Sequence, residues 1–225
     1  HKRLKQWSYL APNYFAWSKL ENAEDLSRKD KSEQAIQNFE QAAQLFDESN
    51  RILNDAAENI ESFEKQLVIK LIKATKVRHE YCAGRIVLEE AKILDKKGDH
   101  QFSSKKFKDA AEAFERIMNA LETEAEKKEV ELIATLSKAW QKMTQAEAEM
   151  SPDLYLEAAQ LFEQAKNFNI DEKTKTLSLG HYHFCKALES GTKFIDTIDM
   201  TMRNTAIQEL ESAADYYLSL IHISE

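Results

Sequence analysis

One short pattern with helical spacing recurs four times along the chain and constrains its fold more than any other feature. A small residue is followed four positions later by a large apolar residue and, three positions after that, by another small or aliphatic residue. On a helix these offsets place the three side chains on one stripe. The first two positions of the four copies are Ala35/Phe39, Ala110/Phe114, Ala158/Phe162 and Ala206/Leu210.

The distances between these anchor residues indicate an internal repeat. Ala110, Ala158 and Ala206 follow one another at intervals of 48 positions. Ala35 and Ala110 are 75 positions apart, so one unit has longer helices. Units of this size stack because one helical hairpin cannot bury its apolar stripe alone. A second set of aligned positions lies in the preceding helix of each unit: Tyr14, Cys82, Ser137 and Cys185.

The composition supports a purely helical chain. Only four glycines and two prolines occur in 225 residues, whereas a β-sandwich or barrel needs many more turn-forming residues. Hydrophobic residues make up 43% of the chain, which is too many for a disordered segment. We therefore expect an all-α fold, an α-solenoid of about four antiparallel hairpins with eight helices.

Start and stop signals divide the chain into helices. Pro12 is interpreted as a first-turn proline, Gly98 as the residue that ends a helix, and Ser151 as an N-cap. Ser103 or Ser104 is expected to begin the fourth helix. The expected helices are 12–28, 33–59, 62–97, 105–121, 124–150, 152–167, 172–194 and 201–218. They form one repeat domain, 12–218, with units 12–60, 61–122, 123–168 and 171–218.

Both ends of the chain look artificial. It begins with His1 rather than methionine, and residues 219–225 are predicted to break the helical pattern. We expect 219–225 to be a non-native tail and the chain to be a fragment from a metagenomic reading frame.

The second helix of each unit resembles helix B of the tetratricopeptide repeat (TPR), with its A-x-x-x-F-x-x-A pattern. Gly98 stands twelve residues before Ala110, and Ala146 twelve before Ala158, where that family has a glycine or alanine. The family's period of 34 residues and its inter-repeat proline are not matched here. The chain is also similar to uncharacterised archaeal TPR-like proteins. The resemblance implies stacked hairpins whose first helices line a concave side, and it implies no activity.

The charge balance disfavours several partner classes. The formal net charge is −8, opposite to that of a typical nucleic-acid-binding module. No run of about 18 apolar residues is present, so we expect no membrane span. The two cysteines lie 103 positions apart and no signal peptide is visible, which favours a cytoplasmic protein.

Basic side chains are concentrated on the first helices and acidic ones on the second helices. If the first helices line a groove, that groove is more basic than the outer surface, and an acidic or C-terminal segment of a partner protein would suit it. The alternative is that these are ordinary solvated helix faces. The candidate groove residues are Arg85, Lys138, Lys142 and Lys186.

Two groups of histidine and cysteine residues have spacings that could suit a metal site or catalysis. His181 and Cys185 are four positions apart on one helical face, but His183 lies on another face and Cys185 matches a small packing position of the repeat. His79 and Cys82 are three apart, with no third group to orient them. We therefore expect no catalytic residue, no metal site and no cofactor.

The pattern as a whole favours a non-enzymatic protein-interaction scaffold that binds a partner segment in a helical groove. The alternative is a regulatory or sensor helical domain of a larger enzyme whose catalytic part lies elsewhere. Self-association is a further expectation, because the apolar faces of the end units have no neighbour within the chain.

Overall fold

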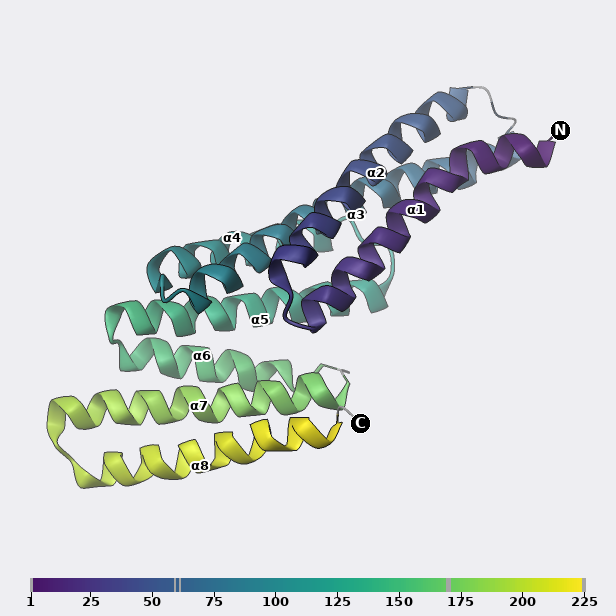
Figure 1. The fold of residues 1–225 in the computed structure, drawn as a ribbon. Helices are drawn as coiled ribbons and strands as arrows, with labels where there is room; N and C mark the ends of the chain where they lie inside the picture. Colours follow the sequence, from purple (N-terminus) through teal and green to yellow (C-terminus); the bar gives the residue numbers. More distant parts are fainter. Residues whose placement is uncertain (1, 59, 61, 169–170, 224–225) are drawn as a thin grey trace.

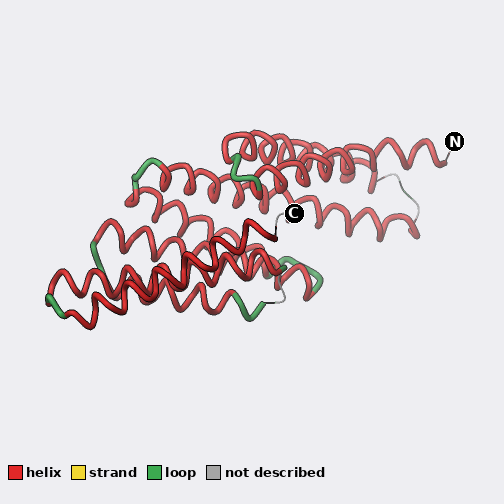
Figure 2. The backbone as a smooth tube through the Cα atoms, turned by 60° about the horizontal axis from the view of Figure 1, so that its bottom comes forward, coloured by secondary structure: helices red, strands yellow, loops and turns green. Residues whose placement is uncertain are grey.

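The structure, a computed structural model, describes residues 2–58, 60, 62–168 and 171–223, and in these ranges it contains eight α-helices and no strand (Figures 1 and 2). The expected all-α fold is confirmed. The helices are α1 (Lys2–Arg28), α2 (Ser32–Glu58), α3 (Ser62–Lys96), α4 (His100–Met118), α5 (Glu124–Glu149), α6 (Pro152–Ala165), α7 (Glu172–Thr197) and α8 (Met200–Ile223).

The helices form a solenoid of hairpins. Each packs against the next one along the chain, and Figure 1 shows α5–α8 as a row of neighbouring helices with α1–α3 crossing obliquely at the other end. The odd-numbered helices also touch one another through side chains, and α2, α4 and α6 each pack between two odd-numbered helices, whereas α8 packs against α7. These contacts are the Tyr81 hydroxyl donating to Glu24 Oε1 at 2.9 Å, Arg78 Nη2 to Glu126 Oε1 at 2.5 Å, and the rings of Trp140 and His181 at 6.1 Å.

The turn inside each hairpin contains one residue with left-handed backbone. Gly98 has φ +76°, its N–H donates to the Asp95 carbonyl, and the Asp99 N–H donates to the Leu94 carbonyl. This is the glycine-ended helix that the sequence predicts. The residues that take this conformation in the four successive hairpins are Asp30, Gly98, Met150 and Ile198.

The repeat anchors are buried wherever another helix follows. Phe39, Phe114 and Phe162 are fully buried. Their counterpart Leu210 is 46% exposed, because no helix follows α8 in the described chain. The small anchors of the first three units, Ala35, Ala110 and Ala158, are fully buried as well, whereas Ala206 is only partly buried.

The alignment of the first helices holds for three units only. Cys82, Ser137 and Cys185 are fully buried, but Tyr14 is 61% exposed. In the described chain no helix precedes α1, so nothing covers the position that Tyr14 occupies. Tyr14 and its neighbour Phe15, 66% exposed, form an open apolar face at this end of the solenoid.

The prediction that Pro12 lies in a first helical turn is wrong. Pro12 lies inside α1, which starts ten residues earlier. A proline there removes one backbone hydrogen bond and crowds the preceding turn. Leu10 packs against the cluster of Leu53 and Val68, and this contact favours the helical conformation on the N-terminal side of the proline.

Two other helix ends differ from expectation. α4 begins at His100, and the hydroxyls of Ser103 and Ser104 donate to carbonyls of neighbouring helices, Ala91 and Gln141, rather than capping α4. α8 continues to Ile223. The prediction that residues 219–225 break the helix is therefore wrong for 219–223. Residues 224–225 lie outside the described residues.

Trp140 joins the two main parts of the apolar core. One cluster extends from α1 to α5 and the other from α5 to α7, and Trp140 packs against both. Its ring stacks on Phe107 of α4 at 5.9 Å and meets the edge of Phe162 of α6 at 6.0 Å. Among the described residues, no helix combines the length and apolarity that crossing a bilayer requires.

Two glycines in α7 are expected to respond oppositely to alanine. A Cβ at Gly180 would lie 2.6 Å from a ring carbon of Tyr217, so Gly180→Ala forces α7 and α8 apart and should lower the unfolding free energy by about 1–3 kcal/mol. A Cβ at Gly191 meets nothing within 4 Å, so Gly191→Ala should raise it by about 0.5–1 kcal/mol through helix propensity. Urea denaturation of both variants tests this. Equal effects would contradict the close packing of α7 on α8.

Candidate partner-binding cleft

Arg85, the first candidate groove residue, lies in a buried network between α1, α2 and α3. Its side chain is 9% exposed, and its guanidinium pairs with Glu24 Oε2 at 2.8 Å and donates to the Ser27 hydroxyl at 2.9 Å. Glu89, fully buried, accepts hydrogen bonds from Ser27, Ser32 and Lys92 in the same network. The charge of Arg85 is therefore used inside the chain and is not offered to a partner.

The other three candidates are more exposed but have acidic partners within the chain. Lys138 of α5 pairs with Glu115 of α4, and Lys142 Nζ lies 2.6 Å from Glu157 Oε2 of α6. Lys186 Nζ lies 2.7 Å from Glu189 Oε2 one turn further along α7.

The basic first helices and acidic second helices seen in the sequence thus form ion pairs with one another within the fold. At Lys138 and Lys142, basic residues of an odd-numbered helix meet acidic residues of the even-numbered helices on either side. Exposed pairs of this kind contribute little stability individually, roughly 0–1 kcal/mol. A role of these lysines in binding a partner remains a prediction.

A cleft on the odd-numbered helices carries two lysines, Lys70 and Lys73, that pair with no acid in the part of the chain that the structure describes. It lies between α1, α3 and the turn before α5, encloses about 220 Å³, and we call it the α1/α3 cleft. Its apolar lining is extended along α3 by Leu67, which is 56% exposed one helical turn before Leu71. The side chains that line the cleft are Trp17, Lys70, Leu71, Lys73, Ala74, Val77, Arg78, Ala120, Leu121, Glu122, Thr123 and Glu126.

The rim of the α1/α3 cleft is weakly basic. Arg78 is neutralised by Glu126 and lies over the Trp17 ring, with 4.8 Å from its guanidinium carbon to the ring centre. Lys70 and Lys73 are exposed and, in the described ranges, have no ion-pair partner. Glu122 is the other acidic residue at the rim. Two exposed ammonium groups therefore flank an apolar floor.

The His181, His183 and Cys185 side chains do not converge. His181 Nδ1 lies 2.5 Å from the Tyr217 hydroxyl and its ring packs on Phe162, and burial lowers its pKa to about 4. His183 Nδ1 lies 2.6 Å from Glu209 Oε2. Cys185 is fully buried, and burial raises the pKa of its thiol to about 12, so it stays protonated at neutral pH.

His79 and Cys82 also separate in space. His79 is exposed on α3, with Nδ1 3.1 Å from the Ala43 carbonyl oxygen, and Cys82 is fully buried. Burial raises the pKa of the Cys82 thiol to about 12. A thiol with such a pKa is almost entirely in its unreactive protonated form.

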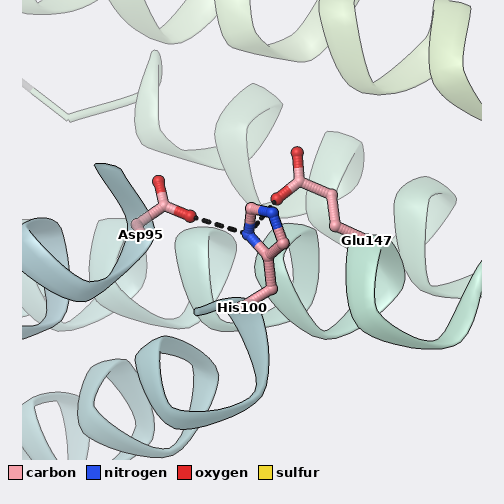
Figure 3. A group of neighbouring side chains, drawn as sticks. All are labelled: Asp95, His100 and Glu147. Atoms are coloured by element: carbon pink, nitrogen blue, oxygen red, sulfur yellow. Dashed lines mark hydrogen bonds and ion pairs between the residues drawn. The ribbon is translucent and has the colours of Figure 1, made fainter. Parts of the chain in front are cut away.

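A different set of residues is brought together where α3, α4 and α5 meet (Figure 3). His100 Nδ1 lies 3.2 Å from Asp95 Oδ1 and 3.0 Å from Glu147 Oε2. Burial, together with the charge of Asp95, raises the pKa of Glu147. Sequence reasoning missed this set because Glu147 lies 47 positions after His100 and the pairing depends on how α5 aligns with α4.

None of the protein-family models, curated proteins or solved structures compared with the chain matches it. The resemblance to tetratricopeptide repeats therefore stays an expectation from the sequence, and the function has to be argued from the surface of the molecule.

Proposed function

We propose that this chain is a protein-interaction scaffold, and that the α1/α3 cleft receives an acidic or C-terminal segment of a partner protein. The observation that carries the proposal is a pair of lysines, Lys70 and Lys73, that have no ion-pair partner among the described residues and lie beside an apolar floor that includes Trp17 and Leu71. A segment with a large apolar side chain next to carboxylates complements both features.

The size of the cleft favours a peptide segment over a small-molecule ligand. About 220 Å³ is less than the roughly 300–1,000 Å³ typical of small-molecule pockets, and the lining of the cleft follows α3 from Lys70 to Arg78. An apolar side chain anchored on Trp17 would supply most of the binding energy, since aromatic residues are enriched among binding hot spots. The lysines would mainly fix orientation and speed association.

A peptide selection tests the proposal. A library of random peptides displayed on phage is selected on the intact chain and counter-selected on Lys70→Glu/Lys73→Glu. The expected result is enrichment of peptides that carry two or more carboxylates beside a large apolar residue. Circular dichroism verifies that the variant keeps its helical content.

Two results would contradict the proposal. One is that the selected peptides show no acidic enrichment. The other is that they bind Lys70→Glu/Lys73→Glu as tightly as the parent chain. A second variant, Leu71→Ser, separates the apolar contribution from the charge, and it is expected to weaken binding without changing its dependence on salt.

The ends of the solenoid support the separate expectation of self-association. Ile207 and Leu210 on α8 are 41% and 46% exposed, and Tyr14 and Phe15 lie open on α1. Exposed apolar faces of this kind favour contacts between molecules.

A further inference from the structure

Asp95, His100 and Glu147 come from three helices and lie around one point (Figure 3). Asp95 is in the last turn of α3, His100 is the first residue of α4, and Glu147 is in the last turn of α5. One potential ligand atom from each side chain lies within 4.8 Å of the other two. All three side chains are partly buried, between 25% and 34% exposed, so an ion can reach them from solvent.

The distances suit a metal ion of the size of Zn²⁺. The two oxygens lie 3.2 and 3.0 Å from His100 Nδ1. If an ion lay about 2.1 Å from each ligand atom, these separations would give N–ion–O angles of roughly 90–100°, between the octahedral and tetrahedral values. One imidazole nitrogen with two carboxylate oxygens is a donor set that first-row divalent transition metals accept.

The charge around this point also favours a cation. In the described part of the chain, neither Asp95 nor Glu147 is paired with a lysine or arginine, whereas Asp30, Glu89 and Glu90 are each paired with a lysine. With His100 neutral, the three side chains carry a charge of about −2, which a divalent ion would compensate.

The local fold places the three groups before any ion is present. Gly98, with its left-handed backbone, lies in the short turn between the end of α3 at Lys96 and the start of α4 at His100, and this turn brings His100 back beside Asp95. The hydroxyl of Ser104, one turn further along α4, donates to the Gln141 carbonyl of α5 and sets how α4 lies on α5. Two fixed contacts thus align the ligands, and such pre-organisation lowers the cost of binding.

We infer that Asp95, His100 and Glu147 form a binding site for a divalent transition-metal ion, with Zn²⁺ as the ion that fits best. The ion clamps the turn between α3 and α4 to the end of α5, and therefore ties the second hairpin to the third. The site lies about 30 Å along α3 from Lys73. This inference and the proposed peptide cleft can therefore fail independently of each other.

Isothermal titration of the intact, chelator-treated chain with Zn²⁺ tests the inference. The parent chain is expected to bind one ion, and His100→Gln is expected to bind none. Asp95→Asn and Glu147→Gln should each bind at least 10-fold more weakly than the parent. Mg²⁺ in large excess should not compete, because it binds imidazole poorly. Zn²⁺ should also raise the thermal unfolding midpoint of the parent chain and leave that of His100→Gln unchanged.

His183→Gln is the matched control, because His183 also contacts a carboxylate but only one. It should keep the full affinity. Visible absorption of bound Co²⁺ serves as a second measurement where a variant has altered stability. The inference is overturned if Zn²⁺ binds His100→Gln or Glu147→Gln as tightly as the parent chain, if His183→Gln abolishes binding, or if no ion binds the parent chain.

Discussion

Phe162→Ala is expected to lower the free energy of unfolding by about 3–5 kcal/mol. Phe162 of α6 is fully buried against α5 and α7, where its ring meets Trp140 and His181 at centroid distances of 6.0 and 5.0 Å. Removing the ring deletes apolar contact with both neighbouring helices and leaves a cavity that rigid helices can fill only in part. Urea denaturation monitored by circular dichroism measures the loss.

Leu210→Ala is the matched control for this prediction. Leu210 holds the corresponding position of the last unit but is 46% exposed, so its truncation should cost less than about 1 kcal/mol. If Leu210→Ala were as costly as Phe162→Ala, another helix would have to cover α8 in solution, and the description of α8 as an open end would be wrong.

Glu89→Gln is expected to lower the free energy of unfolding by about 2–4 kcal/mol at neutral pH. The Glu89 carboxylate is fully buried, with Lys92 Nζ and the Ser32 hydroxyl each 2.7 Å away. The amide cannot compensate the charges of Arg85 and Lys92. Glu90→Gln, next along α3 and 40% exposed, is the control and should cost at most about 0.5–1 kcal/mol.

The cost of Glu89→Gln should depend on pH. Burial alone would raise the pKa of Glu89, but the charge of Lys92 and the hydrogen bonds from Ser27 and Ser32 hold it below its usual value of 4.5. A lowered pKa means that the carboxylate stabilises the fold above about pH 4.5 and loses this contribution as the pH falls further. The stability difference between parent and variant should therefore shrink between pH 5 and pH 3. A difference that stays constant over this range would contradict the ionised network.

Much of the fold follows from sequence periodicity. The stripes through Phe39, Phe114 and Phe162 predict which faces are buried, and the scarcity of glycine and proline predicts the helical class. Periodicity describes a helix face but not which neighbour covers it. The exposure of Leu210 and Tyr14 therefore emerged only from the three-dimensional arrangement.

The functional surface was harder to predict. The basic character of the first helices is visible in the sequence, but whether a lysine is free depends on residues in other helices. Lys138 meets Glu115 and Lys142 meets Glu157, 23 and 15 positions away, whereas Lys70 and Lys73 meet no acid in the described chain. Helix ends were also harder to predict. Pro12 suggested a helix start, but the packing of Leu10 against other helices favours a helix that begins ten residues earlier.

The most direct test of the proposed binding cleft compares two double variants that remove the same charge. A labelled acidic peptide from the selection is titrated with the parent chain, Lys70→Gln/Lys73→Gln and Lys138→Gln/Lys142→Gln, and binding is followed by fluorescence anisotropy. If the α1/α3 cleft receives the segment, the first variant should bind about 5- to 30-fold more weakly and the second within about twofold of the parent. Equal weakening in both variants, or weakening only in the second, would contradict the cleft as the binding site.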